Sequence, residues 1–146
     1  MANTFALDLS RFAAKASAAP ATVTRKVSLD LLAKVVLRTP VGNPDTWQNP
    51  APAGYVGGRL RANWNTSIGR ADVSTSTETA NTAVTRGTAR LSRFDGVQDI
   101  YIMNSLPYVR RIEYEGWSNQ AKAGMVRVTV LEFQAFVEKA VRSLPK

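Results

Sequence analysis

The first quarter of the chain carries two apolar patterns of helical period, over residues 4–18 and 22–38. Apolar side chains three or four positions apart form the stripe of an amphipathic helix. The first stripe consists of Phe5, Leu9, Phe12 and Ala16, and the second consists of Val23, Val27, Leu31 and Val35. Pro20 interrupts the pattern between them, and the Thr39-Pro40 pair should end it. We therefore predict two helices, or one kinked helix, in this region.

The strongest periodicity lies near the C-terminus, over residues 125–144. Steps of four, three, four, four and three positions separate the members of one apolar stripe, which are Val126, Val130, Phe133, Val137, Val141 and Leu144. At 3.6 residues per turn this pattern predicts a single long helix of about five turns, with these side chains on one apolar face that Met125, Phe136 and Ala140 widen.

Between the helices, residues 59–68 alternate between apolar and polar side chains. Period two is typical of a half-buried strand, and it places Trp64 on the apolar face, so we interpret this tryptophan as a core residue. The first four residues of the segment fit a helical turn equally well. Residues 78–94 have the pattern of a weak helix despite Gly87, and residues 99–103 form a short apolar strand.

The segment 39–58 contains four prolines and four glycines in 20 positions. Loops of this length within a domain tend to be functional or disordered. Trp47 and Tyr55 argue against disorder, because aromatic residues are scarce in segments that never pack. We expect an extended loop that orders against a neighbour. The whole pattern predicts one domain over residues 1–146 of the α+β class, with several helices packed on a small antiparallel sheet.

Composition removes many chemistries at once. The chain has neither Cys nor His, which excludes a cysteine nucleophile, an imidazole general base, and thiolate or imidazole metal ligands. Gly57-Gly58 is not followed by the Lys-Ser/Thr pair of a phosphate-binding loop. We find no catalytic, metal or cofactor site, and predict that the protein is not an enzyme.

The formal net charge is +8 at pH 7, which indicates attraction to nucleic acid or to an acidic partner. The basic residues are spread along the chain, and this favours a solvated or partner-facing surface over a dedicated nucleic-acid stripe. The start of the chain lacks the pattern of a signal peptide, and no apolar run approaches the roughly 20 residues that span a bilayer. We expect a soluble protein.

Residues 104–118 combine aromatic and charged residues without a reacting group. Asn104 or Ser105 could cap a short helix there. Glu113 and Glu115 are the nearest approach to a carboxylate pair, but they lie two positions apart, and Arg110 and Arg111 are close in sequence. Ion pairing on the surface is therefore favoured over acid–base catalysis.

Tryptophan, tyrosine and arginine are the residue types enriched at interface hot spots, since they offer rigid area with a polar group. Most of these residues lie beside loops or charged positions. The candidate contact residues for a subunit or partner interface are Trp47, Tyr55, Arg59, Arg61, Tyr108, Arg110, Arg111, Glu113, Tyr114 and Trp117.

Two stretches, residues 57–69 and 100–134, resemble the neck or tail-completion family of tailed bacteriophages. The first carries a Gly-Arg-Leu-Arg-x-x-Trp pattern, formed by Gly58, Arg59, Leu60, Arg61 and Trp64. The second carries Asn-x-Leu-Pro-Tyr, Glu-Tyr, Gly-Trp-Ser and Gly-Met-Val-Arg, formed by Asn104, Leu106, Pro107, Tyr108, Glu113, Tyr114, Gly116, Trp117, Ser118, Gly124, Met125, Val126 and Arg127. The chain departs from the family at Glu115, inserted before Gly116, and at Lys122, where proline is common.

The resemblance implies a structural protein of the virion, located at the head–tail junction and assembled in the host cytoplasm. It implies a homo-oligomeric ring of six subunits between the head-closure (stopper) protein and the tail terminator or tail tube, with genomic DNA passing through the lumen without sequence-specific contacts. A ring requires two different surface patches on each subunit. We expect the 39–58 loop and residues 108–118 to contribute to them. The alternative function is a small basic nucleic-acid-binding module.

Overall fold

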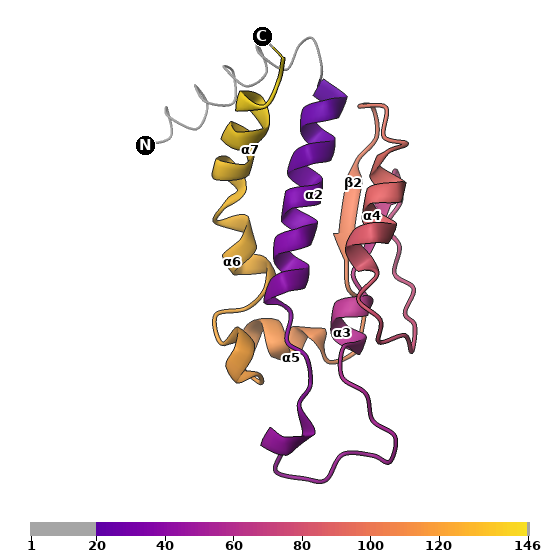
Figure 1. The fold of residues 1–146 in the computed structure, drawn as a ribbon, viewed down its shortest axis with the longest axis vertical. Helices are drawn as coiled ribbons and strands as arrows, with labels where there is room; N and C mark the ends of the chain where they lie inside the picture. The colour runs from indigo at the N-terminus through magenta and orange to yellow at the C-terminus, as the bar shows by residue number, and fades with distance from the viewer. Residues whose placement is uncertain (1–19, 146) are drawn as a thin grey trace.

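The computed structural model describes residues 20–145, so the helix predicted over residues 4–18 lies outside the described residues. Helix α2 (Pro20–Arg38) runs through the middle of the molecule, with α6 and α7 on one side and α4 with the sheet on the other (Figure 1). Pro20 begins this helix, a position where the missing N–H is harmless. The helix ends at Arg38, directly before the Thr39-Pro40 pair, as predicted.

The described residues contain six α-helices and a two-stranded antiparallel sheet, and the predicted α+β class is confirmed. Strand β1 (Asn65–Ile68) pairs with β2 (Ile100–Met103), with Asn65 opposite Met103 and Ile68 opposite Ile100. The remaining elements are α3 (Arg59–Ala62), α4 (Ala83–Leu91), α5 (Val109–Tyr114), α6 (Val126–Val130), α7 (Phe133–Arg142), and the short 3-10 helices η1 (Pro44–Thr46) and η2 (Asn119–Ala121).

Residues 59–68 contain both of the structures that their pattern allows. The first four form α3 and the last four form β1. The predicted apolar face is confirmed, since Leu60, Ala62 and Trp64 are all buried. The indole Nε1 of Trp64 donates a 2.8 Å hydrogen bond to Thr39 Oγ1, so the polar edge of this core tryptophan is satisfied inside the protein.

Gly87 permits the close packing of α4 against α2. A Cβ atom at this position would lie 2.2 Å from Leu32 Cδ2 and 3.0 Å from Thr66 Oγ1. The predicted helix over residues 78–94 is therefore real although shorter, and the glycine that weakens its helical propensity lets it approach its neighbour.

The main core lies between α2, α3, the sheet and α5. Its buried members are Leu32, Val35, Val36, Leu60, Trp64, Ala83, Leu106, Ala121 and Met125. A second cluster joins the start of α2 to α7, and consists of Val23, Val27, Phe136 and Ala140. The two clusters together make α2 the helix on which both halves of the molecule pack.

The single helix predicted over residues 125–144 is wrong in two respects. It is divided into α6 and α7, and Arg38 holds the junction through a 2.6 Å ion pair with Glu132 and a 3.1 Å hydrogen bond to Thr129 Oγ1. Along α6 the buried residues are Met125 and Thr129, so the buried side is rotated by about one residue from the predicted stripe. Val126, Val130 and Phe133 are consequently exposed. Along α7 the predicted face is confirmed, since Phe136 and Ala140 are buried and Val137 and Leu144 pack against the second cluster.

The predicted caps of the short helix are also wrong. Helix α5 has Tyr108 at its N-cap, and Asn104 instead joins two other segments. The Asn104 side chain donates to Leu60 O at 2.8 Å and accepts from the N–H of Leu106 at 3.3 Å. Asn104 therefore fixes the turn that leads out of β2.

Candidate interaction surface

The C-terminal end of α5 and the segment that follows it expose two aromatic rings, and each has an arginine placed over it. Trp117 is 61 % exposed, and the guanidinium carbon of Arg111 lies 4.3 Å from its ring centroid. Tyr114 is 63 % exposed, and the guanidinium carbon of Arg127 lies 4.9 Å from its centroid. Cation–π contacts of this kind hold large side chains in a fixed position at the surface. We call these four residues the aromatic–arginine patch.

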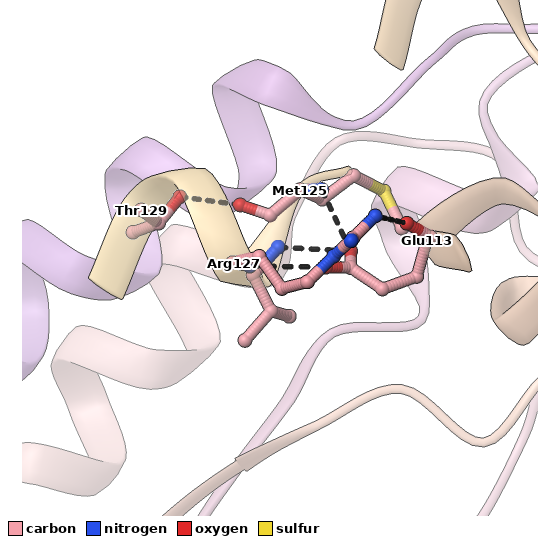
Figure 2. Close-up of polar contacts among 5 residues, drawn as sticks. Glu113, Met125, Arg127 and Thr129 are labelled. Carbon is pink, nitrogen blue, oxygen red and sulfur yellow. Dashed lines mark hydrogen bonds and ion pairs between the residues drawn. The ribbon is translucent and has the colours of Figure 1, made fainter. Parts of the chain in front are cut away.

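Glu113 is buried next to this patch and contacts its residue Arg127. It is only 5 % exposed, and its carboxylate accepts the backbone N–H groups of Met125 at 2.6 Å, Val126 at 2.9 Å and Arg127 at 2.9 Å (Figure 2). These are N–H groups at the start of α6, which have no partner within the helix. A carboxylate at this end of a helix is also favoured by the helix dipole. Glu113 therefore attaches α6 to α5.

Arg127 takes part both in the aromatic–arginine patch and in the contacts of Glu113. Its Nε atom lies 3.3 Å from Glu113 Oε1, and its Nη2 atom donates to the backbone carbonyl of Glu113. The guanidinium group is thereby fixed where it contacts the ring of Tyr114. Arginine suits this position because its planar group can donate hydrogen bonds and stack on a ring at the same time.

The electrostatics of Glu113 follow from its partners. Burial of the carboxyl raises its pKa, but the hydrogen bonds from Arg127, Met125 and Val126 lower it by more, so the pKa of Glu113 lies below its ordinary value. The group is therefore an ionised structural anchor at neutral pH. Glu113 was predicted to pair on the surface with Arg110 or Arg111, and that prediction is wrong, because it is buried and pairs with Arg127.

Gly124 makes room for this anchor. Its φ of +92° is a left-handed conformation that side chains rarely adopt, and a Cβ atom would lie 2.6 Å from Glu113 Oε1. The glycine thus lets the chain turn over the carboxylate immediately before α6 begins.

The loop over residues 39–58 carries a second aromatic pair. Trp47 and Tyr55 meet edge to face, with ring centroids 4.8 Å apart and an angle of 62° between the ring planes. Both rings are partly exposed. Asn43 caps the short helix η1 by accepting the N–H of Asp45 at 3.1 Å. Apart from η1, this proline-rich and glycine-rich segment has no helix or strand, and its ordering against a neighbour stays a prediction.

Gln120 joins this loop to the segment that follows α5. Its Oε1 atom accepts the N–H of Val41 at 3.2 Å, and its Nε2 atom donates to Val41 O at 2.9 Å. Two segments 79 positions apart in sequence are thereby held together. The loop and α5 both lie at the end of the molecule that is lowest in Figure 1. The structure thus brings the two predicted contact segments to one end of the molecule.

Three other candidate contact residues have internal roles. Arg59 donates through Nε to Ser76 O at 2.9 Å, and Arg61 donates through Nε to Thr39 O at 2.9 Å. Both guanidinium groups therefore brace the segments around the loop. Tyr108 is partly buried against the main core, and this burial raises its pKa. Arg110 is exposed on α5.

Arg127 and Gln120 are absent from the predicted contact set. A signal for the anchor was nevertheless present in the sequence. The helix that begins near Met125 is preceded by Ala123 and Gly124, so no Ser, Thr, Asp or Asn stands at its start to cap it. Its free N–H groups required an acceptor from elsewhere in the chain, and a nearby glutamate was available.

Comparison with known proteins does not assign a family or a function to this chain. No protein-family model matches the chain, and neither a curated protein nor a solved structure matches it. Within residues 20–145, no three His, Cys, Asp or Glu side chains gather as a metal site would require. None of the helices in that range has the length and apolar character needed to cross a membrane.

Proposed function

We propose that this protein is a structural subunit of the head–tail junction of a tailed phage, a neck or tail-completion protein that acts by assembly and not by catalysis. Copies of the chain form a ring, and the resemblance to the phage family implies that the ring has six subunits. The ring lies between the head-closure protein and the tail terminator or tail tube, and genomic DNA passes through its lumen.

The observation that carries the proposal is the aromatic–arginine patch. Exposed Trp117 and Tyr114 are held in place by Arg111 and Arg127, and Arg127 is itself held by buried Glu113. Side chains that are ordered before binding lose little conformational entropy when a partner covers them. Aromatic and arginine residues in such positions are typical of interface hot spots. This arrangement supports a binding role for the end of the molecule that carries it.

A ring also needs a second, different surface on each subunit. Exposed apolar side chains on α6, at the turn after it and at the start of α7 are candidates for this surface, namely Val126, Val130, Leu131 and Phe133. Large apolar side chains grouped on a surface favour burial by a partner. We propose that this surface of one subunit faces another copy of the chain.

Native mass spectrometry tests the assembly. The charge-reversed variant Arg110→Glu with Arg111→Glu should lose the ring mass that the wild-type chain gives, because it removes the cation from Trp117 and reverses the charge of the patch. The control variant is Lys26→Glu with Arg142→Glu, which makes the same charge change in the first half of α2 and at the last residue of α7. The start of α2 and the end of α7 lie at the end of the molecule opposite α5 (Figure 1). Equal urea midpoints would show that all three proteins are folded. Unchanged assembly of the patch variant would contradict the proposed interface.

Cryo-electron microscopy of particles that carry the chain tests its location. Density for residues 20–145 on the axis between head and tail, repeated around that axis, would support the proposal. Particles that lack this density while the protein accumulates as a free monomer in the infected cell would refute it.

A further inference from the structure

A second surface, separate from the aromatic–arginine patch, is lined with arginine. An open cavity of about 690 Å³ lies between the end of β1, the loop that follows it and the C-terminal part of α4. Its lining residues include Arg70, Arg90 and Arg93, together with Ser67, Asp72 and Gln98. In Figure 1, α4 lies on the side of the molecule away from α6 and α7, above the end that carries α5.

The three guanidinium groups are not held by a hydrogen bond or an ion pair within residues 20–145, although Arg90 is close enough to Asp72 to lower the pKa of that carboxyl. Neither a hydrogen bond nor an ion pair engages the side chain of Arg70, Arg90 or Arg93 in that part of the chain. Arg86, one turn before Arg90, differs in this respect, because its guanidinium group donates to the carbonyls of Ala62 at 2.6 Å and Trp64 at 3.3 Å. The helix therefore uses one arginine for its own packing and presents the next two to the cavity.

The cavity also contains a polar atom that lacks a partner. Ser67 Oγ is buried and makes no hydrogen bond within the described residues. The three arginines and Gln98 also line the cavity, and their guanidinium and amide groups are donors that suit an anion with several oxygen atoms.

One carboxylate opposes this positive charge. Asp72 accepts the N–H of Ser74 at 3.0 Å and its hydroxyl at 2.6 Å, and these bonds, with weaker contributions from Arg90 and Arg86, lower the pKa of Asp72. The carboxylate is thus occupied by the loop and does not form an ion pair with an arginine of the cavity. The balance of three guanidinium groups to one carboxylate remains positive.

We propose that this cavity binds backbone phosphates of duplex DNA, without reading its sequence. The donors are guanidinium, hydroxyl and amide groups, which contact phosphate oxygens readily, and the site has no aromatic ring on which an unpaired base could stack. The inference rests on the proposed function for its setting, because it identifies the surface of the subunit that faces the DNA in the lumen. Its binding chemistry can be measured on the isolated chain.

Fluorescence anisotropy with a labelled duplex of random sequence tests the proposal. The full chain should bind with an affinity that falls as salt rises, and the slope of log K against log salt should be smaller for Arg70→Gln/Arg90→Gln/Arg93→Gln. Each phosphate contact removed should reduce the slope by about 0.9. The reciprocal variant Asp72→Asn should bind more tightly, because it removes the opposing charge.

A matched control separates the cavity from the net charge of the protein. Lys26→Gln/Lys122→Gln/Arg142→Gln removes the same three charges from α2, from the end of η2 and from α7, and should keep the wild-type slope. An equal loss in both triple variants would overturn the site, because it would mean that net charge alone attracts DNA. Absence of duplex binding, with capture of a polyglutamate peptide by the cavity, would also overturn it and would indicate an acidic protein partner.

The outcome is independent of ring assembly. The Arg110→Glu/Arg111→Glu variant tests the ring, and the cavity variants should form the same oligomers as the wild-type chain in native mass spectrometry. Failure of the ring with retained, cavity-dependent DNA binding would leave the site standing and reject the neck function. Retained rings without DNA binding would reject the proposed DNA site and leave the neck function standing.

Discussion

At the scale of single residues, Glu113 is the side chain on which most of the proposed surface depends. It satisfies three backbone N–H groups, positions Arg127 and, through Arg127, orders Tyr114. We expect Glu113→Gln to lower the free energy of unfolding by about 2 kcal/mol, because hydrogen bonds to a charged acceptor are replaced by weaker ones and one amide group cannot accept. Urea denaturation measures this change. Glu115→Gln, on the exposed side of the same turn, should leave the stability within about 0.5 kcal/mol of wild type.

The lowered pKa of Glu113 gives the stability a pH dependence with a definite sign. Because the folded-state pKa lies below the ordinary value of 4.5, the contribution of Glu113 is fully present above that value. It is lost as the pH falls from there through the folded-state pKa. The difference in unfolding free energy between wild type and Glu113→Gln should therefore shrink as the pH falls below 4.5. A difference that stays constant over this range would contradict the anchor role.

Gly124 offers a test of the space above the carboxylate. Gly124→Ala should destabilise the protein by more than Gly54→Ala, since both positions have positive φ but only the first places a Cβ within 2.6 Å of another atom. At Gly54 nothing lies within 4 Å, so that variant measures the conformational cost alone, about 1 kcal/mol. Urea midpoints of the two variants give the comparison. Equal effects would mean that the contact with Glu113 does not constrain the turn.

At the scale of elements, the packing of α4 on α2 depends on the absence of a side chain at position 87. An alanine in a helix interior is normally more stable than glycine by about 1 kcal/mol. Here we expect Gly87→Ala to destabilise by about 1 to 3 kcal/mol, because its Cβ would lie 2.2 Å from Leu32 Cδ2. The double variant with Leu32→Ala should be more stable than the sum of the two single changes predicts. Additive effects in the urea-derived free energies would refute the clash.

Sequence alone could predict the elements in which the local apolar pattern matches the side chains that are buried in the structure. The stripe of α2 and the start of the alternation over residues 59–68 match the buried faces, because α2 packs on both clusters and Leu60 and Trp64 pack in the main core. The part of the 125–144 stripe that lies on α6 does not, since the orientation of α6 is set by Glu113 and Arg38, which are distant in sequence. The contact between Gln120 and Val41 is equally invisible to local patterns. The types of the surface residues could be predicted from sequence, but their neighbours could not.

At the scale of the whole molecule, the three surfaces to which we assign different partners lie in different places. The aromatic–arginine patch and the Trp47–Tyr55 loop lie at one end, the arginine-lined cavity lies beside α4, and the exposed apolar side chains lie on α6 and the start of α7. A ring subunit needs such a division, because its neighbours, its axial partners and its lumen meet it from different directions.

The apolar surface can be tested with two residues of equal exposure. Leu131 and Val97 are each 84 % exposed, so neither contributes to a core, and Leu131→Ser and Val97→Ser should both change the unfolding free energy by less than about 0.5 kcal/mol. Only Leu131→Ser should weaken self-association, because it alone removes apolar area from the surface that we assign to a neighbouring copy. Sedimentation velocity over a concentration series provides the measurement. If both variants associate like the wild-type chain, the surface formed by α6 and the start of α7 is not part of the ring, and its partner must be a different protein.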